Sequence, residues 1–151
     1  MADIPKTAEE SDPRERVIWA LRRAELAVQK VKDQRLRALG MNAAHYTLLI
    51  SVDAEPGLAG ATLARRLNVT PQAIASLVAR LEDGGLVERR THPRHPQVKE
   101  LHLTAAGRDA LREAEKVIDG IEQRVLDLIG ADESEHLRAV LDKVSGAFQP
   151  A

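Results

Sequence analysis

Apolar residues recur at helical spacing near both ends of the chain. In the N-terminal part they stand three or four positions apart, at Val17, Leu21, Ala24, Val28 and Val31. Such a stripe predicts one long amphipathic helix. Asp12-Pro13 is a helix-start signal and Gly40 is a stop signal, so the expected helix spans residues 12–40.

The C-terminal third shows the same kind of pattern. Thr104 is suited to cap a long helix that Gly130 would stop, and a last helix would continue to residue 148. The apolar stripes of these two helices consist of Ala110, Ala114, Val117, Ile118, Ile121, Val125, Leu128, Leu137, Val140, Leu141, Val144 and Phe148. Helices therefore dominate both ends.

The middle of the chain contains shorter elements. Asn42 can cap a helix over residues 43–54, and "AEPGLAG" then has the composition of a turn. The run "GATLARRLN" predicts a short helix that Asn68 would end in a left-handed conformation. The run "TPQAIASLVARLEDGG" predicts another, with Thr70 as cap and Pro71 at the first helical position. Because only about three residues separate the two, this is the layout of a helix-turn-helix.

A β-hairpin is expected directly after these helices. The segments "LVERRT" and "VKELHLT" have strand-like alternation and flank a loop that contains two prolines. Leu101 and Leu103 would share one face of the returning strand, with Lys99 on the same side nearer the tip. The predicted fold is therefore mainly α with a small β-hairpin.

Composition narrows the class of protein. A length of 151 residues suits one domain, and the absence of cysteine excludes disulfides, thiolate zinc sites and thiol chemistry. No run resembles a signal peptide or a membrane span. We therefore expect a soluble cytoplasmic protein with no membrane contact.

Charge is unevenly distributed along the chain. The net charge is −1, but residues 62–99 carry seven basic and three acidic side chains, a balance of +4 that leaves −5 for the remainder. A basic middle in an acidic chain is typical of a protein that presents one face to a polyanion.

The second of the two short helices has an outer face that is suited to DNA. With Ile74, Leu77, Val78 and Leu81 facing inward, its outward residues are Gln72, Ala73, Ser76 and Arg80. Glutamine can pair with adenine, serine with several acceptors, and alanine can meet a thymine methyl group. We predict that this helix reads DNA, with Thr70 at its cap and with Arg65, Arg94 and Lys99 as further contacts. The alternative for each residue is ordinary solvated surface.

The central motifs resemble those of a known family. The pieces "LARRLNVTPQ", "LVARLEDGGLVERR" and "LTAAGRDAL" are similar to the winged helix-turn-helix core of the MarR family of bacterial transcriptional regulators. The resemblance implies a homodimer in which the terminal helices of both chains interlock. Residues 12–40 and 104–148 would then form the dimerisation region, residues 41–103 the winged DNA-binding domain, and residues 1–11 a disordered N-terminus.

The resemblance also implies a function. Members of the family bind pseudo-palindromic operators in double-stranded DNA, and many release DNA when a small phenolic or lipophilic compound binds. We therefore expect a homodimeric, sequence-specific regulator that acts as a ligand-released repressor. Independently, the apolar terminal helices need partners, which favours a dimer over a monomeric helical domain.

The wing departs from the commonest family pattern. Where the resemblance places an Asp-Arg pair, this chain has His95 and Pro96, so Arg94 is the nearest substitute for the arginine. His92 and His95 have a spacing that is also found in metal sites, which leaves a metal-responsive regulator as an alternative. We expect no bound metal or other cofactor, because a zinc site usually needs three or four ligands.

Further predictions concern a small-molecule effector and enzymatic activity. Trp19, His45 and Tyr46 lie near the place where the resemblance puts an effector pocket, although core packing explains the two aromatic residues equally well. No catalytic motif of the common kinds is present, so we predict that the chain is not an enzyme. A winged helix used only for protein contacts remains a third possibility, against which the basic wing argues.

Overall fold

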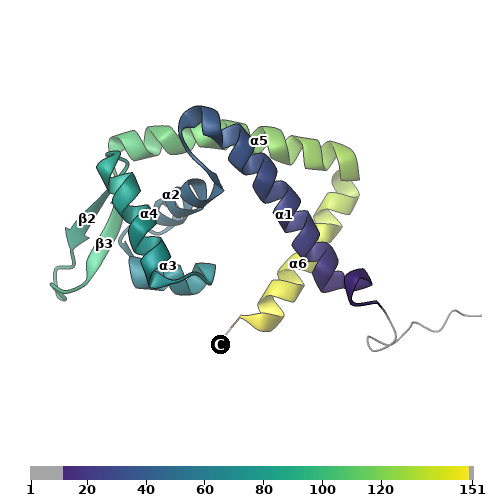
Figure 1. The fold of residues 1–151 in the computed structure, drawn as a ribbon, viewed down its shortest axis with the longest axis horizontal. Helices are drawn as coiled ribbons and strands as arrows, with labels where there is room; N and C mark the ends of the chain where they lie inside the picture. Colours follow the sequence, from purple (N-terminus) through teal and green to yellow (C-terminus); the bar gives the residue numbers. More distant parts are fainter. Residues whose placement is uncertain (1–11, 150–151) are drawn as a thin grey trace, which may run out of the picture.

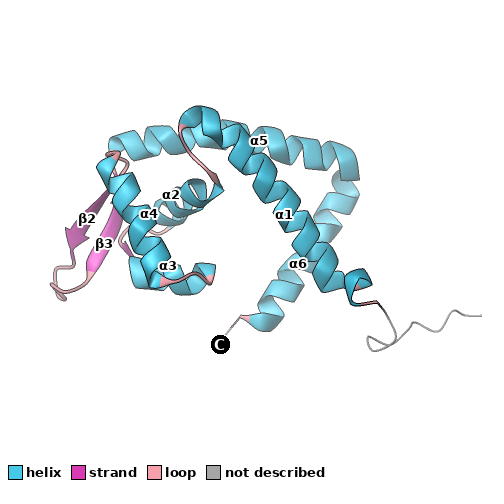
Figure 2. Cartoon of the chain, viewed as in Figure 1, coloured by secondary structure: helices cyan, strands magenta, loops and turns pink. Residues whose placement is uncertain are grey.

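The computed structural model describes residues 12–149, and the prediction for residues 1–11 lies outside this range. Figures 1 and 2 show a small group of elements at one end, formed by α2 (Ala43–Ala54), α3 (Gly60–Leu67), α4 (Pro71–Asp83), β2 (Val87–Thr91) and β3 (Lys99–Leu103). The long helix α5 (Ala105–Ile129) runs from this group to the other end, where α1 (Val17–Leu36) and α6 (Ala131–Phe148) lie. Helices therefore predominate, as predicted.

The first long helix is shorter than the sequence suggests. Asp12-Pro13 begins only a 3₁₀ turn, Pro13–Glu15, and α1 spans Val17–Leu36 after a break at Arg16. A second 3₁₀ turn, Arg37–Leu39, follows, and Gly40 has a φ of 70°. The expected stop is confirmed, but the single helix over residues 12–40 is wrong. Arg16 has an extended ψ of 147°, which no helix can contain.

The helix-turn-helix forms where the sequence predicts it. Helix α2 spans Ala43–Ala54, α3 spans Gly60–Leu67 and α4 spans Pro71–Asp83. Asn68 takes the left-handed conformation that ends α3, at a φ of 52°. The side chain of Thr70 caps α4 by accepting a 3.1 Å hydrogen bond from the amide of Ala73. These caps satisfy amides that a helix end would otherwise leave unpaired.

The hairpin belongs to a three-stranded sheet. Strands β2 (Val87–Thr91) and β3 (Lys99–Leu103) pair antiparallel, and β1 (Leu58–Ala59) pairs with the other edge of β3. The sequence predicts only a turn around Pro56 and misses β1. A strand of two residues has no periodicity of its own, and its pairing with Leu101 and Glu100 is non-local.

Two C-terminal helices complete the fold. Helix α5 spans Ala105–Ile129 and begins at Thr104, whose hydroxyl accepts a 3.0 Å hydrogen bond from the amide of Gly107. Gly130 separates it from α6, which spans Ala131–Phe148. Within the described residues, no helix combines the length and the apolar character that a membrane span requires.

The hydrophobic core is concentrated in the winged domain. Its fully buried side chains include Leu36, Leu48, Leu49, Leu63, Val52 and Val87. By contrast, Leu36 is the only buried residue of α1, and α6 has none. Large apolar side chains of the terminal helices are exposed, among them Val17, Ile18, Trp19, Leu128, Leu137, Val140 and Phe148. One copy of the chain therefore leaves an extended apolar surface uncovered.

Candidate nucleic-acid interface

Helix α4 presents a polar face to solvent. Ile74, Val78 and Leu81 are buried and Leu77 is half-buried, which anchors the helix as its apolar spacing predicts. On the opposite side, the side chains that the sequence assigns to DNA are all exposed: Gln72, Ala73, Ser76 and Arg80. The helix is therefore held from one side and free on the other, as a reading helix must be.

The basic side chains of residues 62–99 fall into two groups. Three of them are in ion pairs: Arg66 with Glu55, Arg89 with Glu82 and Arg90 with Glu88. The other four make no ion pair with any residue in the described part of the chain: Arg65, Arg80, Arg94 and Lys99. These four are the cations that the sequence assigns to DNA. We call them the unpaired cations.

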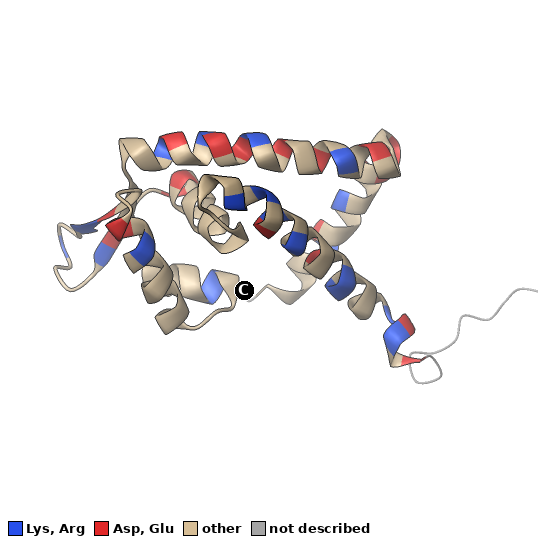
Figure 3. Cartoon of the chain, turned by 45° about the horizontal axis from the view of Figure 1, so that its top comes forward, with Lys and Arg blue, Asp and Glu red and all other residues tan. Residues whose placement is uncertain are grey.

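The unpaired cations come from three different elements. Arg65 lies on α3, Arg80 on α4, and Arg94 and Lys99 on the wing. All four are exposed. Figure 3 shows basic residues along the wing and on α4, whereas α5 alternates between the two signs of charge. Four unpaired positive charges at this end of the molecule favour a polyanion over a neutral partner.

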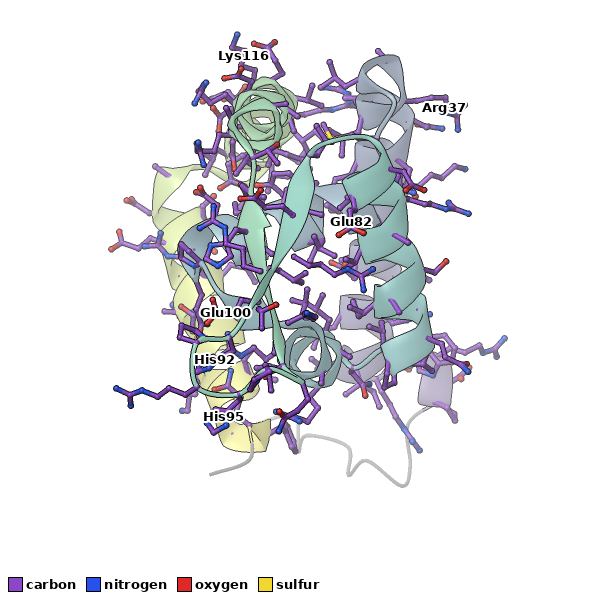
Figure 4. The ribbon with its side chains drawn as sticks, turned by 90° about the vertical axis from the view of Figure 1, so that its left-hand side faces the viewer. Arg37, Glu82, His92, His95, Glu100 and Lys116 are labelled. Atoms are coloured by element: carbon purple, nitrogen blue, oxygen red, sulfur yellow. The ribbon has the colours of Figure 1, made fainter. Side chains whose placement is uncertain are left out.

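The wing extends beside α4. Figure 4 shows β2 and β3 next to α4, with His92 and His95 at the tip of the hairpin and Glu82 on the helix. The Nζ of Lys99 donates a 2.9 Å hydrogen bond to the hydroxyl of Thr91 on the opposite strand. Lys99 is thereby held at the strand end while its charge stays exposed.

A pocket of about 530 Å³ lies beside the exposed face of α4. Its wall combines Glu25 and Gln29 of α1, His45 of α2, and Ser76 and Arg80 of α4. Apolar side chains, among them Leu67, Val69 and Leu77, complete the lining. The pocket therefore offers one cation, one carboxylate, several hydrogen-bonding groups and an apolar surface, and it shares residues with the candidate DNA-binding face.

His45 is the member of the predicted effector set that lines this pocket. Its Nδ1 accepts a 3.0 Å hydrogen bond from the amide of Asn42, while Asn42 Oδ1 accepts from the amide of His45 at 2.9 Å. In the neutral ring, Nε2 therefore carries the proton and can serve as a donor. Burial, and secondarily the charge of Arg80, lowers the pKa of His45, which favours this neutral form.

The other two members of that set lie elsewhere. Tyr46 is buried, and its hydroxyl donates a 2.9 Å hydrogen bond to Glu115 of α5. Trp19 lies on the exposed N-terminal half of α1 and does not line the pocket. The sequence suggests one group of three, but the structure does not bring them together. The sequence did not predict Gln29 and Arg80 as pocket residues, because the approach of these two residues depends on how α1 packs against the winged domain.

The wing histidines are arranged around a carboxylate. Glu100 Oε2 lies 3.3 Å from the Nε2 of His102, and Glu100 Oε1 lies 3.8 Å from the Nε2 of His92. The sequence did not predict this cluster, because strand alternation alone does not bring His102 toward the tip. Among the described residues, no group of three His, Asp or Glu side chains is placed to hold a metal ion. The metal-responsive alternative thus gains no support from the geometry.

Comparisons with known proteins agree with this geometry. A family model described as MarR family matches residues 39–95. The HTH-type transcriptional repressor Rv2887 of Mycobacterium tuberculosis (strain ATCC 25618 / H37Rv) is 33% identical over 109 residues, which are 72% of this chain and 78% of that protein. The chain belongs to the MarR family.

Solved structures of MarR-family regulators superpose well on the chain. The transcriptional repressor CouR bound to a 23-mer DNA duplex has a TM-score of 0.81 at 27% identity, covering 87% of this chain and 93% of that one. Rv2887 in complex with salicylic acid has a TM-score of 0.73 at 29% identity, covering 90% and 98% respectively. This MarR-family chain is therefore a winged-helix transcriptional regulator and not an enzyme, and regulators of this family act as dimers.

Proposed function

We propose that this MarR-family regulator binds an operator with α4 in the major groove and the wing against the neighbouring backbone. Gln72, Ala73 and Ser76 would meet base edges, while the unpaired cations and the hydroxyl of Thr70 would contact phosphates. The observation that carries the proposal is the division of the basic side chains. Those in ion pairs are partly neutralised, and the four left unpaired lie on α3, α4 and the wing, the three elements of the winged helix-turn-helix.

We infer that residues 41–103 form the DNA-binding domain and that residues 12–40 and 104–148 form the dimer. The concentration of buried residues in the first range supports this division, as do the exposed apolar side chains on α1, α5 and α6. A two-fold dimer would repeat α4 about 34 Å away, one turn of DNA. The operator would then be pseudo-palindromic, and the protein would act in the cytoplasm, where bacterial DNA lies.

We infer further that a small anionic compound with an apolar body releases the DNA. In the pocket beside α4, Arg80 and the Nε2–H of His45 could bind a carboxylate while Leu67 and Leu77 contact the apolar part. Rv2887, the relative crystallised with salicylic acid, supports this class of ligand. Because Ser76 and Arg80 also belong to the candidate DNA face, a bound anion would compete for the same side chains.

Selection from a random-sequence duplex library tests the central part of this proposal. The full-length protein should enrich sequences with two related half-sites about 10 base pairs apart, and binding should survive non-specific competitor DNA. Adding salicylate should lower the affinity for the selected duplex. A library that stays random after repeated rounds would contradict operator binding. An unchanged affinity with salicylate would contradict only the proposed ligand class.

A further inference from the structure

The wing tip is a short loop in which few backbone amides can donate hydrogen bonds. It runs from His92 to Val98, and Pro93 and Pro96 within it have no N–H group. The amide of His92 donates to the carbonyl of Val98 at 3.1 Å, and the amide of Val98 donates to the carbonyl of His95 at 2.8 Å. The second bond closes a β-turn with Pro96 at the position that proline favours.

The side chain of His92 binds the two amides that precede this turn. Its Nδ1 accepts a 3.0 Å hydrogen bond from the amide of Arg94 and a 3.1 Å hydrogen bond from the amide of His95. The acceptor thus stands two and three residues before its donors, as the side-chain oxygen of Asn or Asp does in a turn. With both bonds made, every backbone N–H between His92 and Pro96 has a partner.

These bonds fix the tautomer of the ring. A nitrogen that accepts cannot carry a proton, so the neutral ring of His92 is protonated at Nε2. That nitrogen faces Glu100, whose Oε1 lies 3.8 Å away, and a carboxylate favours the protonated Nε2. Figure 4 shows Glu100 on β3 on the same side of the wing as His92. An Nε2 that holds a proton toward a carboxylate has no free lone pair for a metal ion.

We propose that His92 is a positioning residue that sets the wing tip and thereby orients Arg94 toward DNA. The inference rests on the proposed function of the wing. Arg94 makes no ion pair with any residue from 12 to 149, so its direction depends on its own backbone. The amide of Arg94 is one of the two that His92 holds. His92 acts through Arg94 and makes no DNA contact itself.

The test compares three variants at about pH 8, where an ordinary imidazole is neutral. His92→Ala removes the acceptor. His92→Asn keeps an acceptor at the same distance along the side chain, because Asn Oδ1 occupies the position of His Nδ1, but it removes the group that faces Glu100. His95→Ala is the matched control, since it removes the imidazole whose ring centroid lies 5.1 Å from that of His92 and leaves both hydrogen bonds to His92 possible.

Binding is measured on the duplex that the wild-type protein selects from a random library. The two amides share the single lone pair of Nδ1, and loss of this three-centre hydrogen bond in His92→Ala corresponds to a loss of about tenfold in affinity. His92→Asn and His95→Ala should stay within about twofold of the wild type. Arg94→Ala removes a cation that contacts phosphate and should flatten the salt dependence of binding, and His92→Ala should flatten it in the same way. In the Arg94→Ala background, His92→Ala should cause no further loss, because it acts through that arginine.

Measurements on the free protein separate this inference from the proposed function. Nitrogen chemical shifts of the His92 ring should report a bare Nδ1 and a protonated Nε2. The amides of Arg94 and His95 should exchange faster in His92→Ala and not in His92→Asn. A protonated Nδ1, or unchanged exchange in His92→Ala, would overturn the inference whether or not DNA binds. Equal losses of DNA affinity in the Ala and Asn variants would also overturn it. A wild-type protein that selects no duplex would instead contradict the proposed function.

Discussion

The hydroxyl of Tyr46 donates a 2.9 Å hydrogen bond to the carboxylate of Glu115, and this bond joins α2 of the winged domain to α5. The two residues are 69 positions apart in the sequence. Because Tyr46 is buried while α5 continues to the far end of the molecule, the bond is one of the links between the two regions.

Tyr46→Phe should therefore destabilise the protein without leaving a cavity in the core, because the aromatic ring is kept. Removing one hydrogen bond to a charged group at a part-buried site should lower the free energy of unfolding by about 1.5 kcal/mol. Urea denaturation at fixed protein concentration measures this loss. A variant as stable as the wild type would contradict this prediction, because the hydrogen bond would then contribute nothing to the free energy of unfolding.

The same tyrosine should respond to alkaline pH. Burial, and then the hydrogen bond to Glu115, raises the pKa of Tyr46. A raised pKa in the folded state means that the contribution of Tyr46 to stability is present below about pH 10 and is lost as the pH rises above it. Tyr46 is the only tyrosine of the chain, so the absorbance of tyrosinate reports on it directly. An onset of ionisation at the ordinary pKa would contradict its burial.

His45 should make stability sensitive to mild acid. Burial and Arg80 lower its pKa, so the unfolded chain binds a proton more readily than the folded one. The stability that depends on neutral His45 is present above about pH 6.5 and is lost as the pH falls below it. His45→Gln keeps a side-chain acceptor for the amide of Asn42 but does not titrate. The wild type should lose stability between about pH 7 and pH 5.5 faster than this variant. Urea denaturation gives the free energy of unfolding of both proteins at each pH. If the two free energies fell in parallel as the pH fell, the result would contradict a lowered pKa of His45.

Gly107 is required where α5 crosses the start of the wing. A Cβ at this position would lie 1.9 Å from the carbonyl oxygen of Leu86, which belongs to the backbone and cannot turn away. Gly107→Ala should cost about 3 kcal/mol, as overpacking of a tight site does. Gly120→Ala is the control within the same helix, since a Cβ there would meet only Arg35 at 4.0 Å. It should be neutral or stabilise the helix by about 0.5–1 kcal/mol. Thermal denaturation of both variants measures these changes in stability. Equal denaturation midpoints for Gly107→Ala and Gly120→Ala would contradict the close contact between Gly107 and Leu86.

The apolar surface of α6 should determine the oligomeric state. Val140 on α6 is 42% exposed in one chain, and Val69, outside the terminal helices, is 44% exposed. Val140→Asp should shift the protein from dimer toward monomer at micromolar concentration, because a charge would be buried in the interface. Val69→Asp should leave the dimer intact. Light scattering measures the mass of each variant in solution. If both variants were dimers, the result would contradict the placement of α6 in the dimer interface.

Local signals in the sequence predicted most of the elements. Thr70 and Thr104 each act as the expected cap, and Asn68 takes the expected left-handed conformation, because these effects depend on a few neighbouring residues. The register of the apolar stripe also identified the exposed face of α4. The break at Arg16 escaped detection, since Asp12-Pro13 has the form of a helix start and nothing between it and the apolar stripe that begins at Val17 signals an interruption.

Features that depend on distant contacts could not be predicted in the same way. Strand β1 exists through its pairing with β3, and the hydrogen bond of Tyr46 could not be foreseen because its partner Glu115 lies far along the chain. From the sequence, core packing and ligand binding were equal explanations for Tyr46. The arrangement of His92 and His102 around Glu100 depends on the register of the hairpin. The basic residues can be read from the sequence, but which of them an ion pair neutralises depends on the fold.

The contrast between Arg65 and Arg66 tests the account of the DNA interface most directly. These neighbours on α3 differ in that Arg66 pairs with Glu55, whereas Arg65 makes no ion pair with any residue from 12 to 149 and donates a 3.4 Å hydrogen bond to the hydroxyl of Thr62. The measurement is the affinity of Arg65→Ala and Arg66→Ala for the selected duplex across a range of salt concentrations. Arg65→Ala should bind several-fold more weakly and reduce the slope of log affinity against log salt by about 1, and Arg66→Ala should change neither. Equal effects of the two substitutions would contradict the claim that the unpaired cations carry the DNA contacts.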